Sequence, residues 1–143
     1  MQRPSVETRV LLNGCWDVFH FGHLDHIKAA RKLGDILYVS VTDDLHVNKG
    51  LGRPIFPQEH RVAILKAVLC GIDNNGPHKV FIVSSLTEAI DFAKPHILVK
   101  GTDYRNGLHD YHEKYCQDRG IRITYTDTPK LSAMEMIIEA GRR

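Results

Sequence analysis

Residues 13–23 read Asn-Gly-Cys-Trp-Asp-Val-Phe-His-Phe-Gly-His, and this stretch decides the fold of the 143-residue chain. It follows an apolar run at 10–12 that is typical of a buried parallel strand, and it leads into 24–33, which has helical spacing. The stretch therefore predicts a strand-to-helix turn, the place where an open α/β sheet binds ligands. Backbone N–H groups at such a helix start suit a phosphate, and His20 and His23 share one face of its first turn.

The composition is that of a globular protein, with 43% hydrophobic and 25% charged residues. The length suits a single domain over residues 1–143. A formal net charge of +2 is too small to predict a nucleic acid or a membrane surface as partner, and no apolar stretch is long enough to span a bilayer. The N-terminus lacks a signal-peptide core, and Cys15, Cys70 and Cys116 are an odd, widely spaced set. These features predict reduced thiols and a cytoplasmic location.

Strand and helix patterns alternate along the rest of the chain. The expected strands are 8–12, 35–41, 79–83, 96–100 and 121–125. The expected helices are 20–33, 58–69, 84–93 with its serine caps, 108–118 and 131–140. This alternation predicts an α/β, Rossmann-like fold in which helices cover both faces of a doubly wound five-stranded parallel sheet.

The histidines allow both structural and functional interpretations. A pair three residues apart is by itself more often structural, but the preceding strand, the glycine turn and Asp17 favour function for His20 and His23. His26 continues the spacing and could complete a metal trio, yet the helical twist carries it off the face of His20, so we expect a partly exposed surface residue. A second set with metal-like spacing comprises His109, His112 and Cys116. It lies on a polar helix, which favours an exposed amphipathic face over a metal site.

Further candidates follow the second and fourth expected strands. Lys49 and Arg53 lie in a glycine-rich loop, either as solvated surface cations or as a clamp that folds over a polyphosphate. Asp103 and Tyr104 follow the fourth strand, which the expected topology places beside the first, so a ligand contact is favoured there. Cys15 has no neighbouring thiol, and we interpret it as a small packing residue.

With these residues in place, the chain resembles the cytidylyltransferase-like nucleotidylyltransferase family. The His-x-Gly-His motif of that family is present at 20–23, Gly-x-x-Asp precedes it at 14–17, and the likeness runs from about Val10 to Ile138. Within the family the chain is most similar to the domains that transfer AMP to heptose 1-phosphate. The segments that support this likeness are 13–17, 31–35, 49–50, 53–54, 59–61 and 98–104. Glycerol-3-phosphate cytidylyltransferases and FAD synthetases are the next most similar.

The resemblance implies a role for each matching residue. His20, His23 and Lys49 would be catalytic and would stabilise the transition state at the phosphates. Nucleotide and phosphate would be bound by Gly14, Cys15, Trp16, Asp17, Gly22, Lys100, Gly101, Asp103, Tyr104 and Ser132. Arg53, Arg61 and Lys130 would support the site. The resemblance further implies ATP or CTP as substrate, Mg²⁺ held by phosphate oxygens rather than by a protein metal site, a phosphorylated small-molecule acceptor, and a homodimer.

One segment departs from the family pattern. Cytidylyltransferases usually carry Arg-Thr-x-Gly-Ile-Ser-Thr before the last helix, where this chain has Asp-Thr-Pro-Lys-Leu-Ser-Ala at 127–133. The heptose-type domains also lack that arginine, which favours AMP transfer from ATP to a heptose 1-phosphate with release of pyrophosphate. Glycerol 3-phosphate with CTP and FMN with ATP remain alternatives. Because Ala133 lacks the usual hydroxyl, with Lys130 as a possible replacement contact, a catalytically silent nucleotide-binding module is a further alternative.

Overall fold

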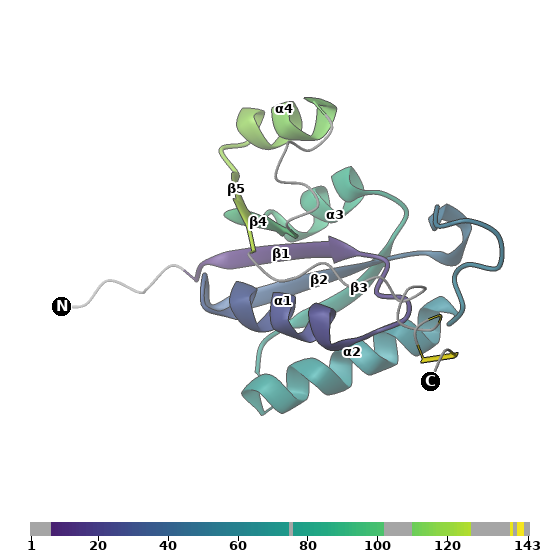
Figure 1. Cartoon of the computed structure of the whole chain (residues 1–143). Coiled ribbons are helices and arrows are strands. Elements are labelled where there is room, and N and C mark those ends of the chain that lie inside the picture. Colours follow the sequence, from purple (N-terminus) through teal and green to yellow (C-terminus); the bar gives the residue numbers. More distant parts are fainter. Residues whose placement is uncertain (1–6, 75, 102–109, 127–137, 139, 142–143) are drawn as a thin grey trace.

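The computed structural model of the chain describes residues 7–74, 76–101, 110–126, 138 and 140–141. Its parallel sheet has five strands in the order β3-β2-β1-β4-β5 (Figure 1). The strands are β1 (Arg9–Gly14), β2 (Ile36–Thr42), β3 (Lys79–Val83), β4 (Ile97–Lys100) and β5 (Arg122–Tyr125). The helices within the described ranges are α1 (Phe21–Arg31), the short 3-10 helix η1 (Asp44–His46), α2 (Gln58–Asp73), α3 (Leu86–Ala93) and α4 (Asp110–Asp118). The predicted doubly wound sheet is thus confirmed.

The boundaries of two helices differ from expectation. Helix α1 spans Phe21–Arg31 and so ends before the expected Leu33. Helix α2 continues past Leu69 to Asp73, because Ile72 packs against the same buried cluster as Leu69 and gives the extra turn an apolar contact. It ends where Asn74 takes a left-handed φ of 43°. The expected helix at 131–140 lies largely outside the described residues.

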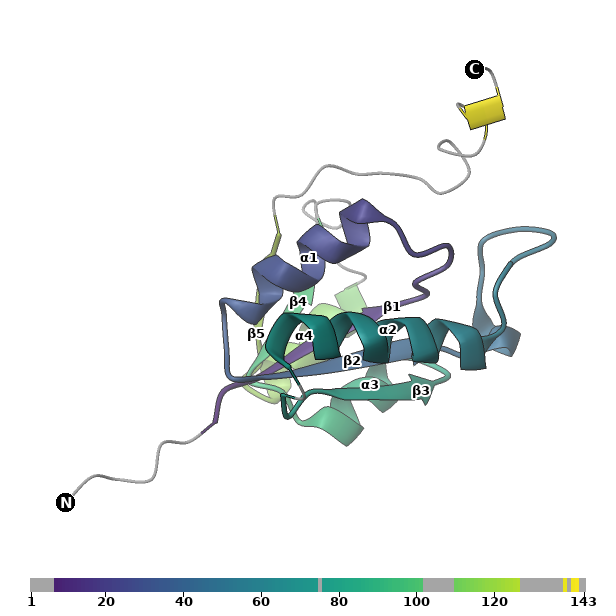
Figure 2. The ribbon, with the colours of Figure 1, turned by 90° about the horizontal axis from the view of Figure 1, so that it is seen from below.

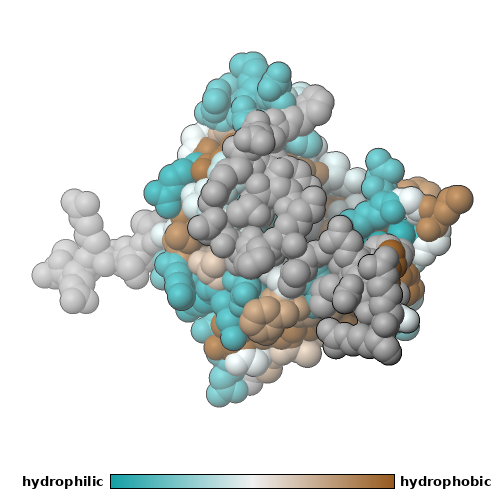
Figure 3. Space-filling model, in the orientation of Figure 1, coloured by the Kyte–Doolittle hydropathy of each residue, from teal (hydrophilic) through white to brown (hydrophobic). Residues whose placement is uncertain are grey.

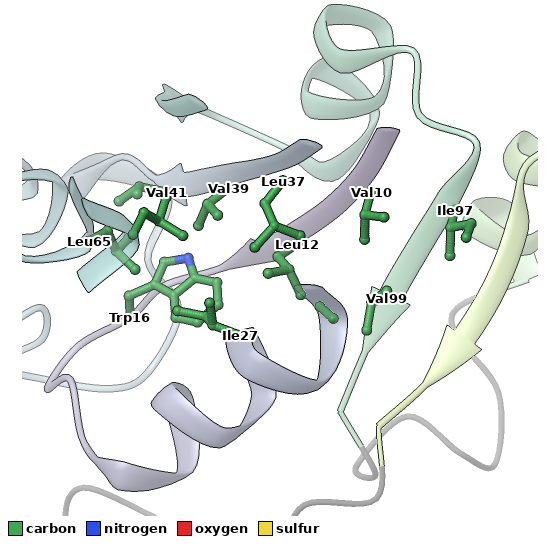
Figure 4. Close-up of a cluster of buried hydrophobic side chains, with 12 residues drawn as sticks. Val10, Leu12, Trp16, Ile27, Leu37, Val39, Val41, Leu65, Ile97 and Val99 are labelled. Atoms are coloured by element: carbon green, nitrogen blue, oxygen red, sulfur yellow. The ribbon is translucent and has the colours of Figure 1, made fainter. Parts of the chain in front are cut away.

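Each strand sends alternate side chains to opposite faces of the sheet. Val10 and Leu12 of β1 face α1 and α2 and pack with Ile27 and Leu65 (Figure 4). Leu11 points the other way, into a second cluster formed with α3 and α4. Figure 1 shows α3 and α4 above the sheet, and Figure 2 shows α1 and α2 side by side on the opposite face. Strand β1 is therefore covered on both faces, as its unbroken apolar run predicts.

The sheet topology places the carboxyl ends of β1 and β2 side by side, where the chain leaves the sheet toward α1 and into the loop at 43–57. Strand β1 pairs with β2 on one side and with β4 on the other, so its carboxyl end lies at the switch point of the sheet. Strand β2 leads into a loop at 43–57 that projects beyond the sheet (Figures 1 and 2). Hydrophobic surface gathers where this loop projects (Figure 3), and Leu45 and Leu51 are exposed on it. Within the described ranges, every helix is too short or too polar to cross a bilayer.

Candidate active site at the carboxyl end of β1

The two motif histidines cap the start of α1 and orient each other. His20 is the N-cap residue, and its Nδ1 accepts a hydrogen bond from the N–H of Gly22 at 3.0 Å. The Nδ1 of His23 in turn accepts from the N–H of His20 at 3.2 Å, which completes a capping box built from two imidazoles. The rings stack with centroids 3.9 Å apart. Because both Nδ1 atoms accept, each neutral ring carries its proton on Nε2, which is then a donor.

The surroundings of His23 keep that ring uncharged. Burial lowers its pKa from 6.5 to about 3, and the nearby charges of His20, Lys49 and His26 act in the same direction. Trp16 and Phe19 both lie with ring centroids 5.4 Å from His23. Both motif histidines nevertheless remain half-buried and not sealed in the core. At neutral pH His23 therefore presents a neutral N–H donor beside a helix start, where a developing negative charge is stabilised.

The side chain of Trp16 is buried beneath the motif turn. Its indole is buried in the cluster beneath α1 (Figure 4), and its Nε1 donates to the carbonyl of Ser40 at 2.9 Å. The left-handed φ of 59° turns the ring inward, and a Cβ at Gly14 would lie 3.1 Å from it. Gly14 thus makes room for the indole. The indole packs against the ring of His23, and a contact between Trp16 and the nucleotide stays a prediction.

Asp17 and Arg53 hold the long loop onto the turn. The carboxylate of Asp17, 2% exposed, accepts from the N–H groups of Ile55 at 2.7 Å and Phe56 at 2.9 Å and from Nε of Arg53 at 3.0 Å. Burial would raise the pKa of Asp17, but these bonds from Phe56, Ile55 and Arg53 lower it overall. The side chain of Arg53 is only 9% exposed. Arg53 is therefore neither a solvated cation nor a freely closing clamp. The carboxylate of Asp17 faces the loop, and its contact with a substrate stays a prediction.

Arg61 of α2 joins three separate segments of the site. Its guanidinium is buried and donates to the carbonyls of Cys15 at 2.8 Å, Thr42 at 2.7 Å and Phe56 at 3.0 Å. It also pairs with the carboxylate of Asp44 at 2.7 Å. The motif turn, the end of β2 and the end of the loop therefore share one cation. This geometry fits the supporting role expected of Arg61, although the sequence pattern did not reveal its complete burial.

A polar network joins the ends of β1, β2 and β4. Lys100 is 7% exposed, and its Nζ donates to the carbonyl of Asn13 at 3.4 Å. The amide of Asn13 donates to Oγ of Ser40 at 2.8 Å. Burial lowers the pKa of Lys100 to about 8, so the amine is mostly charged at neutral pH. Sequence reasoning missed Asn13 and Ser40; a polar residue inside an otherwise apolar strand was the signal that could have identified Ser40.

The remaining predicted residues separate into those that are described and those that are not. Lys49 is exposed on the projecting loop, and its charge reaches both His23 and Cys15. Cys15 is half-buried, and burial raises the pKa of its thiol, which suits the packing role expected of it. Gly22 is buried and Gly101 half-buried at the end of β4. Asp103, Tyr104, Lys130 and Ser132 lie outside the described residues.

The described part of the chain offers no protein cage for a metal ion. No three or more His, Cys, Asp or Glu side chains lie close enough there to hold one. Cys116 is fully buried in the cluster beneath α3 and α4, which corrects the expectation that it lies on an exposed helix face. His109 lies outside the described residues, so that trio is not placed as a whole.

Most of the chain is similar in sequence to known proteins. Residues 11–136 match the family described as cytidylyltransferase-like. The chain is 44% identical over 137 residues to the bifunctional protein HldE of Desulfatibacillum aliphaticivorans, covering 93% of this chain and 27% of that protein. It is 38% identical over 147 residues to the bifunctional protein HldE of Methylococcus capsulatus, covering 98% and 29%. The chain thus spans roughly a quarter of the length of these relatives.

Solved structures share the fold at lower sequence identity. The lipopolysaccharide core biosynthesis protein of Thermoplasma volcanium superposes with a TM-score of 0.68 at 22% identity, covering 87% of this chain and all of that one. A protein of unknown function from Archaeoglobus fulgidus gives a TM-score of 0.64 at 19% identity, covering 87% and 96%. At these identities the likeness establishes the fold alone.

Proposed function

Because the chain belongs to the cytidylyltransferase-like family of nucleotidyltransferases, we propose that it transfers AMP from ATP to a heptose 1-phosphate and releases pyrophosphate. The single observation that carries the proposal is the pair of mutually oriented imidazoles, His20 and His23, at the start of α1. Their stacked rings lie at the helix N-terminus, where the backbone favours the negative charge of a triphosphate.

The chemistry asks for little more than positioning and charge stabilisation. A phosphate oxygen of the acceptor attacks the α-phosphorus of the nucleotide in line, and the bond to pyrophosphate breaks. The acceptor is already an anion near neutral pH, so no strong general base is needed. His20 and His23 donate to phosphate oxygens as charge develops, and Lys49 on the loop neutralises part of it. Mg²⁺, when bound to the phosphates, would supply further neutralisation of charge.

The choice of substrates rests on resemblance. Most of the segments that make the chain similar to heptose 1-phosphate adenylyltransferase domains surround the site, from Asn13 to Asp17, at Arg61 and at Lys100. The HldE proteins are 38–44% identical over nearly the whole of this chain. Arg53 and Arg61 bind the motif turn and so hold the loop that carries Lys49 against it. This contact would keep Lys49 close to the substrates' phosphates. We extend the proposal to a homodimer, which light scattering on the purified chain would measure.

A pyrophosphate-release screen tests the proposal. ATP and CTP are each incubated with heptose 1-phosphate, glycerol 3-phosphate and FMN in the presence of Mg²⁺, and we expect the fastest release with ATP and heptose 1-phosphate. Faster release with CTP and glycerol 3-phosphate, or with ATP and FMN, would replace the substrates but keep the reaction. Tight ATP binding without pyrophosphate from any acceptor would instead indicate a nucleotide-binding module.

A further inference from the structure

A short hydrogen bond joins α1, the helix that follows the motif turn, to the end of β5, an outer strand of the sheet. Nδ1 of His26, on α1, lies 2.6 Å from Oγ1 of Thr126, the residue that follows β5. Thr126 is 5% exposed and His26 is half-buried. The ring of His26 also packs 6.3 Å from the indole of Trp16, which supports His23. His26 is therefore partly exposed, as predicted, but its ring also has partners in two other segments of the chain.

The same threonine is connected to the ends of β4 and β1. The N–H of Thr126 donates to the carbonyl of Lys100 at 2.9 Å. Nζ of Lys100 donates to the carbonyl of Asn13, at the start of the motif stretch. The His26–Thr126 bond thus closes a ring of contacts that runs from α1 through β5 and β4 back to β1. Residues expected to bind the nucleotide, Asp103 and Ser132, follow β4 and β5 in the chain.

Helix α1 does not depend on this bond for its attachment to the sheet. Ile27 and Ala30 are completely buried against the strands and anchor the helix through apolar contact. One hydrogen bond adds little to that attachment, on the order of 1 kcal/mol. It does constrain how far the helix can slide or rotate relative to the end of β5, and a displacement of about 1 Å at a reacting centre can cost a hundredfold in rate.

We propose that His26 is a positioning residue that acts through Thr126 to hold α1, and with it the His20–His23 pair, in a fixed position relative to the carboxyl ends of β4 and β5. This proposal rests on the proposed function, since it concerns the same site. It assigns a role to the third histidine of the motif helix that is neither metal binding nor contact with substrate.

Three substitutions isolate the bond. Thr126→Val keeps the shape but removes the hydroxyl, Thr126→Ser keeps the hydroxyl, and His26→Phe keeps a ring without nitrogen. With ATP and the acceptor that performs best in the screen, we expect Thr126→Val and His26→Phe each to lower kcat about tenfold, the equivalent of one lost hydrogen bond. KM for ATP should change by less than about twofold, because ground-state binding is retained.

The controls distinguish positioning from simple destabilisation. Thr126→Ser should retain wild-type kcat, and the double variant His26→Phe/Thr126→Val should be no slower than either single variant, because both remove the same contact. His60→Gln removes an exposed histidine on α2 and should leave kcat unchanged. Wild-type kcat in Thr126→Val, equal losses in Thr126→Val and Thr126→Ser, or additive losses in the double variant would overturn the proposal.

Ring NMR spectra give an outcome that does not need activity. In ¹⁵N-histidine-labelled protein, Thr126→Val should shift the ring signals of His26 and also those of His20 and His23, whereas His60→Gln should not. A shift confined to His26 would overturn the positioning role. If the wild-type protein releases no pyrophosphate with any substrate pair, the proposed function fails, and the ring spectra still decide whether the bond positions the histidine pair.

Discussion

The two ends of the sheet both gather positive charge, but they differ in how it is held. At the carboxyl ends of the strands, Arg61 and Lys100 are buried and donate to named carbonyls. At the amino ends, a hollow of about 570 Å³ is lined by Arg9, Ile90, Asp91, Lys94, Pro95, His96, Arg119, Gly120 and Ile121. Of its cations, Lys94 and Arg119 are exposed, and Arg119 lies over the ring of Tyr115 at 3.4 Å.

Helix direction explains the difference. In a parallel sheet with right-handed crossovers, α1 begins at the carboxyl end of β1, whereas α3 and α4 end beside the amino ends of β4 and β5. A helix start attracts anions and a helix end attracts cations. The guanidinium of Arg9 accordingly donates to the carbonyl of Lys94, the C-cap of α3, at 2.8 Å. At the amino ends of the strands, cations therefore lie against the carboxyl ends of helices. For this reason the number of positive charges at one side of the sheet does not by itself locate a phosphate site.

The largest effect should come from changing Asp17, whose carboxylate holds the loop at the carboxyl ends of the strands. Asp17→Asn removes the charge that Arg53 pairs with and places an amide where backbone N–H groups donate. We expect the free energy of unfolding to fall by about 3 kcal/mol, the scale for breaking a buried ion pair. Chemical denaturation measures it. Exposed Asp118, paired with Lys114 at 3.3 Å, offers a matched control, since Asp118→Asn should cost less than about 1 kcal/mol.

Removing the second motif histidine tests the chemistry at that edge. His23→Ala deletes a preoriented donor, and we expect turnover to fall at least about a hundredfold, as for the loss of a single transition-state donor. Steady-state pyrophosphate release measures the change, and circular dichroism confirms that the variant is folded. A folded His23→Ala protein with near wild-type turnover would refute the catalytic assignment.

The lowered pKa of His23 predicts how stability depends on pH. Since His23 titrates near 3 in the folded chain and near 6.5 in the unfolded chain, only the unfolded state takes up its proton between those values. Its contribution is complete above pH 6.5 and is lost as the pH falls toward 3, with a limiting slope of about 1.4 kcal/mol per pH unit. Denaturation between pH 6.5 and 5 should show a shallower fall for His23→Asn, and equal slopes would contradict the low pKa.

The smallest effect should come from a substitution in the hollow at the amino ends of the strands. Arg119→Ala removes a cation from the hollow and its contact with Tyr115. We expect kcat and KM for ATP to be unchanged and the free energy of unfolding to fall by about 1 kcal/mol or less. Kinetic assays and thermal denaturation check both. A large loss of activity in Arg119→Ala would mean that the amino ends of the strands also contribute to the site.

Local pattern was sufficient for the type and order of the elements and for the place of the histidine pair at the start of α1. The apolar run at 10–12 predicts a strand covered on both faces, as the structure shows, and a spacing of three places His20 and His23 on one side of the helix start. Cys116 shows the limit of such patterns: it sits on a polar helix, yet it is the position that faces α3 and is buried. Its burial depends on which neighbour the helix meets.

The sequence by itself determined the order of strands and helices, the turn at residues 13–23 and the pair of imidazoles at its end, because each depends on periodicity or on residues close along the chain. Only the tertiary structure decided that Trp16 turns inward, that Asp17 and Arg61 hold the loop, and that His26 meets Thr126 across 100 positions. Those side chains acquire their partners when distant segments pack together, and no local pattern encodes which distant carbonyl or hydroxyl will lie within hydrogen-bonding distance.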